Sequence, residues 1–194
     1  FTTAQLKDLF AAPDWHPDSH PTMPDIVAHG RKPAVYACGY CHLPDGQGRP
    51  ENAALAGLSA TYIEAQVADF RSGARRSAWR GTNRPADLMR ASAQNAAHAE
   101  IASAAEYFSG LRLTRRVEVV EATVIPRVVE SDWVYVVAGS NDPETLGHRI
   151  IEVAIDHERH ELRDSTSGYR AYVPRGSIAR GQTIAQSGQG GPAL

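Results

Sequence analysis

The residues that could do chemistry gather in one short stretch of the chain. Among 194 residues there are only two cysteines, and they stand three positions apart in Cys38-Gly39-Tyr40-Cys41-His42. Thiols this close cannot join distant parts of a fold, so their use is local: a metal, a redox pair or a covalent cofactor. C-x-x-C-H is the attachment pattern for haem, in which two thiols reach the vinyl groups of one porphyrin and the histidine binds the iron. We therefore predict one covalent haem c at Cys38, Cys41 and His42.

Two other uses of the cysteine pair stay open. Thiol–disulfide oxidoreductases also carry C-x-x-C, but their second cysteine lies in a helix that continues for several turns. Here Pro44, Gly46, Gly48 and Pro50 follow the motif, and such residues end a helix. A zinc site would need two further ligands, and the sequence offers no second cysteine pair. Both uses are less favoured than haem.

Over residues 26–112 the sequence resembles class I cytochrome c. The similarity rests on Gly30, on residues 41–58 and on a run typical of bacterial mono- and dihaem cytochromes, formed here by Tyr62, Gln66, Phe70, Gly73 and Arg75. The resemblance implies an all-helical domain whose first and last helices cross beside the haem, with residues 102–111 in the last helix. Pro33 departs from the pattern, because it falls inside the expected first helix and should kink or delay it.

The resemblance also implies how the iron is held. Ala53 occupies the place of a proline whose carbonyl orients the proximal imidazole, so we expect the Ala53 carbonyl to accept a hydrogen bond from His42. The family uses a methionine as sixth ligand, and Met89 lies where that ligand is expected, on a stretch that Gly81 and Pro85 mark as an irregular loop. A Met ligand leaves no open coordination site, which predicts electron transfer. If Met89 does not bind iron, the alternative is a haem enzyme or gas sensor with an open distal site.

A basic stretch of six arginines extends from Arg71 to Arg90 and includes Trp79. A solvated surface is the plain interpretation of such a stretch. The functional interpretation is that one or two of its members pair with the haem propionates, while the others steer an acidic partner. For the propionate side we expect Arg75 and Trp79.

The elements that must position these residues fall into four regions. Residues 1–25 are rich in proline and read as an extended arm with a short helix at 3–10, and 26–112 form the haem domain. In that domain residues 62–71 are expected to form a helix capped by Ser59 or Thr61, and 97–111 a helix ending at Gly110. Residues 113–185 are β-rich, with strands expected at 117–124, 133–138, 149–155 and 169–173. Residues 186–194 read as a Gly-rich linker. The predicted fold class is mainly α, a class I cytochrome c domain followed by a small β-rich region.

The composition limits the classes of binding partner and the cellular compartment that we expect for the protein. The net charge of −2 argues against nucleic acid, and no apolar run is long enough to span a membrane. Thioether-bound haem suits a periplasmic or otherwise secreted bacterial protein that exchanges electrons with a dehydrogenase, an oxidase or another cytochrome. Residues 147–181 resemble the connecting region of dihaem bacterial cytochromes, which implies a second haem domain beyond Leu194. The whole protein is then a periplasmic dihaem electron carrier and not itself an enzyme. The plainer alternative is a monohaem protein whose β-rich tail packs on the haem domain.

Overall fold

The computed structural model describes the whole chain except residues 79–80, 132, 140–141 and 189–194. It divides into two compact units. The first contains Phe1–Thr114 together with the short segment Leu162–Ser165, and the second contains Arg115–Glu161 and Thr166–Leu194. No helix within the described residues is long and apolar enough to cross a membrane.

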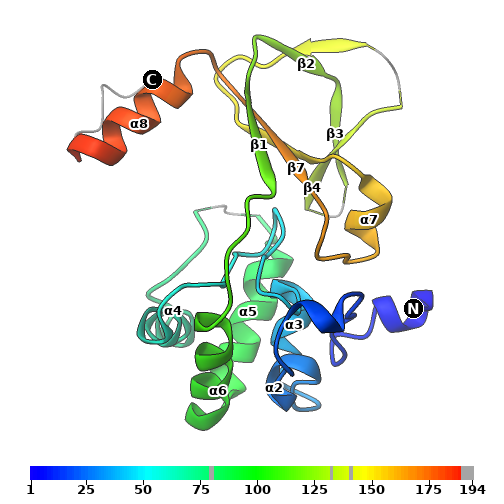
Figure 1. Cartoon of the computed structure of the whole chain (residues 1–194), viewed down its shortest axis with the longest axis vertical. Coiled ribbons are helices and arrows are strands. Elements are labelled where there is room, and N and C mark those ends of the chain that lie inside the picture. The colour runs from blue at the N-terminus through cyan, green and yellow to red at the C-terminus, as the bar shows by residue number, and fades with distance from the viewer. Residues whose placement is uncertain (79–80, 132, 140–141, 189–194) are drawn as a thin grey trace. The chain divides into compact units, whose positions relative to one another are not determined.

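The first unit is helical. Its helices are α1 (Thr3–Leu6), the 3₁₀ turn η1 (Pro17–Ser19), α2 (Asp25–Ala28), α3 (Cys38–His42), α4 (Ala60–Ser72), α5 (Arg84–Asn95) and α6 (His98–Ser109). Helix α4 packs against both α5 and α6, and α2 packs against α3 and α6 (Figure 1). The core between them is formed by Ile26, Val27, Val35, Ala56, Ile63, Ala104, Ala105, Phe108 and Leu111.

Local signals explain where the two helices predicted in this unit begin and end. The Ser59 side chain accepts a hydrogen bond from Tyr62 N at 3.3 Å, so Ser59 and not Thr61 caps α4. Gly73 ends α4 in the left-handed conformation, with φ of 78°. Helix α6 stops at Gly110 as expected, although it begins and ends slightly inside the predicted range of 97–111.

The expected first helix is much shorter than the resemblance implies. Helix α2 ends at Ala28, and the chain then turns at Gly30, whose φ is 63°. A side chain on Gly30 would collide with the Val35 carbonyl, so the turn requires glycine. Arg31 and Val35 then exchange two backbone hydrogen bonds across Pro33, and the motif forms a helix of its own.

The N-terminal arm is part of the first unit, and its helix α1 lies within the range of 3–10 expected for a short helix. Ala12 N donates to Ala28 O at 2.8 Å, and Ala37 N donates to Leu9 O at 2.9 Å. These two backbone hydrogen bonds tie the arm to α2 and to the residue directly before Cys38.

The second unit is built on a five-stranded sheet in the order β1-β7-β6-β4-β3, while β2 and β5 form a separate antiparallel pair. The β1–β7 and β4–β6 pairs are parallel, and the β6–β7 and β3–β4 pairs are antiparallel. The strands are β1 (Val117–Glu121), β2 (Val124–Pro126), β3 (Val128–Ser131), β4 (Val134–Val137), β5 (Pro143–Thr145), β6 (Ile151–Ala154) and β7 (Tyr169–Val173), and the helices are α7 (His157–Glu161) and α8 (Ser177–Ser187).

These elements correct the fold class in part. The description as mainly α holds for the first unit, whereas the second unit is a sheet with its own core of Ile125, Leu146, Ile151, Val153 and Tyr172. The stretch predicted as one strand at 117–124 divides into β1 and β2. Helix α8 covers residues expected to be β-rich or linker, ending at Ser187 before the described part of the chain stops.

Candidate functional site

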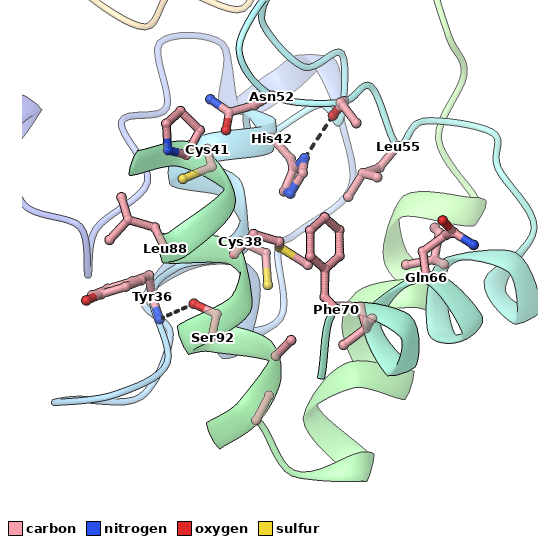
Figure 2. A pocket seen from close by; sticks show the side chains of 18 of the residues that line it. Tyr36, Cys38, Cys41, His42, Asn52, Leu55, Gln66, Phe70, Leu88 and Ser92 are labelled. Atoms are coloured by element: carbon pink, nitrogen blue, oxygen red, sulfur yellow. Dashed lines mark hydrogen bonds between the residues drawn. The ribbon is translucent and has the colours of Figure 1, made fainter. Parts of the chain in front are cut away.

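The C-x-x-C-H residues form the short helix α3. It ends at Leu43, which has φ of 66°, and Pro44 prevents any further turn. In a helix, residues three apart lie on the same side, so Cys38 and Cys41 both present their sulfur atoms to one cavity, with His42 beside them (Figure 2).

The cavity has a volume of about 610 Å³, which is in the range of small-molecule and cofactor sites. Besides α3, its wall is built from residues 51–55 and from α4, α5 and α6. Most of the wall is apolar, including Leu55, Ile63, Val67, Phe70, Leu88 and Phe108. Such a wall suits a large, flat, apolar ring system.

Both cysteines are free thiols and are not poised for redox exchange. Removal from water raises the pKa of Cys38 to about 12, and it also raises the pKa of Cys41 despite the opposing charges of Arg163 and Arg49. Thiol–disulfide oxidoreductases need a thiol of lowered pKa, because the thiolate is the nucleophile. The environment of the pair therefore argues against the dithiol alternative.

His42 is held as a neutral imidazole. Its Nδ1 lies 2.8 Å from Ala53 O, the hydrogen bond expected from the sequence. A carbonyl can only accept, so Nδ1 carries the proton and the lone pair of Nε2 is left for a metal. Removal from water lowers the pKa of His42, which keeps the imidazole uncharged. Metal ligation requires this state of histidine.

The loop after α3 places the Ala53 carbonyl. Gly48 N donates to His42 O at 3.0 Å, and Arg49 and Asn52 exchange two backbone hydrogen bonds that close a tight turn. Gly48 has φ of 71°, and a side chain there would meet the backbone of Ala53 and Ala54. The turn thus brings the chain back to the imidazole eleven residues after His42.

Met89 lines the same cavity as His42, but it lies on helix α5 and not on the irregular loop expected from the sequence. Asn83 caps this helix by accepting from Ala86 N at 3.2 Å, and Pro85 occupies the first turn, where proline is tolerated. Pro85 therefore marks the beginning of a helix rather than a break. The cavity-lining residues of α5 are Pro85, Ala86, Leu88, Met89, Ser92 and Ala93.

Two contacts hold α5 against the rest of the site. Ser92 Oγ accepts from Tyr36 N at 3.3 Å, which joins α5 to the segment before Cys38 (Figure 2). Arg71 on α4 donates to Ala93 O at 2.7 Å and to Ala96 O at 2.5 Å. These contacts fix the part of α5 that follows Met89.

Of the two residues predicted near the propionates, Arg75 lines the cavity. Its guanidinium donates to the Gln66 side chain and lies 5.2 Å from the centre of the Phe70 ring. A cation at the cavity wall is suited to binding a carboxylate. Trp79 lies outside the described residues.

Sequence reasoning missed two parts of the site. Arg49 Nε lies 3.1 Å from Glu51 Oε1 in a nearly buried ion pair, and Glu51 lines the cavity. Arg163 donates from Nη1 to Tyr40 O at 2.9 Å, with its guanidinium carbon 3.7 Å from the centre of the Tyr40 ring. No local pattern could have found Arg163, since more than a hundred residues separate it from the motif.

The donor set fits haem c. It consists of two thiols on one side of a short helix, a neutral imidazole with a free Nε2, and a methionine on the same apolar cavity. Within the described ranges, no group of three or more His, Cys, Asp or Glu side chains could hold a metal ion, as a zinc site would need.

No protein-family model matches the chain. Over 76 residues it is 41% identical to cytochrome c-554(548) of Halomonas halodenitrificans, a stretch that covers 39% of this chain and 84% of that protein.

Two solved structures are similar over 43% of this chain. Reduced recombinant cytochrome c4 from Pseudomonas stutzeri is 31% identical with a TM-score of 0.36, and 43% of that chain is covered. Thiosulfate dehydrogenase (TsdBA) from Marichromatium purpuratum is 28% identical with a TM-score of 0.35, and 17% of that chain is covered. The chain thus spans less than half the length of either.

Proposed function

We propose that this chain, which belongs to the c-type cytochromes, carries single electrons on one low-spin haem c bound covalently at Cys38 and Cys41, with His42 and Met89 as axial ligands. The observation that carries the proposal is the shared cavity: both thiols, the imidazole and the thioether side chain line one apolar space. Haem supplies a one-electron Fe(III)/Fe(II) couple when bound.

The residues of the chain then favour electron transfer over catalysis at an open iron. Ala53 fixes the orientation of the His42 ring, so the proximal side does not need to rearrange between redox states. The thioether of Met89 is soft and neutral, prefers Fe(II) and raises the potential. With both axial positions filled by protein, no site is left for oxygen or peroxide. The apolar wall also raises the reduction potential, because burial disfavours the additional charge of the ferric state.

We assign the propionate side of the haem to Arg75 and Trp79. Arg75 supports this assignment by its place on the cavity wall, where its guanidinium can pair with a carboxylate.

At the level of the whole protein, we propose that residues 26–112 are the haem domain, 1–25 an arm, 113–185 a connecting region and 186–194 a linker to a second haem domain. The compartment is the bacterial periplasm. The redox partner is a dehydrogenase, an oxidase or another cytochrome that docks transiently through a small interface.

One preparation tests the central proposal. The chain, produced with haem-attachment machinery in a bacterial periplasm, should show a reduced low-spin spectrum and, when oxidised, a weak far-red sulfur–iron band. A five-coordinate spectrum would instead favour a haem enzyme or sensor. Recovery of chain without haem would contradict the proposal and reopen the dithiol alternative.

A further inference from the structure

Leu162–Ser165 belongs to the first unit, although the chain on both sides of it belongs to the second. The N-terminal arm holds this short segment at two points. Trp15 Nε1 donates to Leu162 O at 2.8 Å, and His16 Nε2 lies 2.8 Å from Asp164 Oδ1. Arg163 stands between these contacts with φ of 56°, a left-handed conformation that costs energy for a residue other than glycine. The surroundings thus fix Arg163 in a conformation that it would not adopt alone.

The fixed guanidinium of Arg163 is directed at the haem-attachment helix. Its Nη1 donates to Tyr40 O at 2.9 Å, and it stacks on the Tyr40 ring. The Tyr40 carbonyl cannot be paired by the residue four positions later, because that residue is Pro44 and has no N–H. Arg163 therefore supplies the hydrogen bond that α3 cannot provide for itself. The Tyr40 ring is in turn anchored by its hydroxyl, which donates to Leu6 O at 3.0 Å.

The contact also brings a positive charge to the second cysteine. Arg49 is paired with Glu51, and their side chains are only 6% and 11% exposed. Arg163 donates to the carbonyl of the peptide bond that joins Tyr40 to Cys41, so it places a further positive charge beside Cys41, in addition to the Arg49–Glu51 pair. An arginine does not lose its proton at any physiological pH, and a partly buried charge is only weakly screened by salt.

We propose that Arg163 sets the reduction potential of the haem through its fixed positive charge. This inference rests on the proposed function, because it requires a haem at Cys41. Ferric haem carries one more positive charge than ferrous haem, so a fixed cation beside the thioether destabilises the ferric state and raises the potential. The segment Leu162–Ser165 thereby influences the reduction potential of a haem bound at residues more than a hundred positions earlier in the chain.

Three variants of the full chain, matured with haem, separate charge from geometry. Arg163→Gln keeps an N–H donor for the Tyr40 carbonyl but removes the charge, whereas Arg163→Lys keeps the charge. Arg112→Gln is the matched control, since Arg112 is exposed in the same unit and its side chain is in none of these contacts. Reduction potentials are measured by spectroelectrochemical titration at low and high salt, with covalent haem counted by mass.

We expect Arg163→Gln to hold a full complement of haem and to show a potential lower than that of the wild-type chain at both salt concentrations. Arg163→Lys should restore most of the difference, and Arg112→Gln should leave the potential unchanged. A wild-type potential in Arg163→Gln overturns the inference, as does an equal shift in Arg112→Gln. Loss of haem from Arg163→Gln also overturns it, because Arg163 would then be a requirement for attachment. Absence of haem from the wild-type chain would instead refute the proposed function.

Discussion

The protonation state of each reactive group in the cavity follows from its surroundings. His42 is neutral because removal from water lowers its pKa, and its proton is on Nδ1 because Ala53 O accepts it. Removal from water raises the pKa of both Cys38 and Cys41, so both thiols are protonated. At the scale of single residues, a neutral imidazole and two protonated thiols suit a ligand set for a metal-containing ring and do not suit an activated nucleophile.

Met89→Ala decides whether the iron is six-coordinate. We expect haem to remain attached, the potential to fall and the iron to bind carbon monoxide or cyanide, because the variant removes the soft axial ligand. Met23→Ala is the matched control, since Met23 only packs against the core of the first unit. Spectroscopic ligand titration and potentiometry provide the measurement. If Met89→Ala retains the wild-type potential and binds no added ligand, another group holds the iron.

The two thiols are tested by the permanence of attachment. Thioether bonds do not dissociate, so the wild-type chain should keep a mass one haem above that of the polypeptide after acid–acetone extraction. Replacing both Cys38 and Cys41 by alanine should leave haem that this extraction removes completely. Mass spectrometry before and after extraction measures the difference. Haem that resists extraction in the double variant would show that it is bound covalently somewhere else.

Among the elements, α4 is capped at its N-terminus by the side chain of Ser59. Ser59 Oγ satisfies the otherwise unpaired Tyr62 N–H, so Ser59→Ala should lower the free energy of unfolding by about 1 kcal/mol. Thr61 does not accept from Tyr62 N, although its hydroxyl lies 3.3 Å from Ser59 Oγ, and Thr61→Ala should change stability by only a few tenths of a kcal/mol. Urea unfolding followed by haem absorbance reports on the first unit alone. Equal losses in both variants would contradict the assignment of the cap.

Helix α6 is held at its first turn by Glu100. One carboxylate oxygen accepts from Ala97 N at 2.7 Å and the other from Arg31 Nε at 2.6 Å. The hydrogen bond from Arg31, followed by that from Ala97, keeps the pKa of Glu100 below its ordinary value. Because the folded-state pKa is the lower one, the carboxylate stabilises the fold above its unfolded-state pKa. This stability is lost as the pH falls through the folded-state pKa.

Glu100→Gln should therefore be less stable than the wild-type chain at neutral pH, and the difference should shrink in acid. Urea midpoints at neutral and acidic pH measure it. Glu106→Gln serves as control, because Glu106 is exposed on the same helix. A difference between Glu100→Gln and the wild-type chain that is independent of pH would exclude the carboxylate as its source.

The whole chain combines a helical unit with a sheet-containing unit, and only one C-x-x-C-H motif is present in its 194 residues. If the chain is the first half of a dihaem cytochrome, this chain should contain one haem and the protein purified from its source two. Pyridine haemochrome absorbance per mole of polypeptide measures both. A single haem in the native protein would refute the dihaem proposal while leaving the monohaem electron carrier intact.

Much of the site follows from sequence because it depends on local spacing. The two thiols and His42 lie within one short helix, and the return of the chain to Ala53 is enforced by Gly48 and its tight turn. The end of α6 at Gly110 follows from a residue inside or next to the helix. Interactions over so few residues are the same in any context, so a pattern can predict them.

The tertiary structure decided what depends on contacts between distant segments. Met89 lies on a helix because Pro85 is accommodated in the first turn and because Arg71 and Ser92 fix α5 against its neighbours. The parallel pairing of β1 with β7 joins strands about fifty residues apart, and no periodicity encodes such a partner. Arg163 reaches Tyr40 only because the arm holds its segment in place. Sequence thus determined the C-x-x-C-H residues and their local geometry, while only the tertiary structure determined which charges and packing contacts surround them.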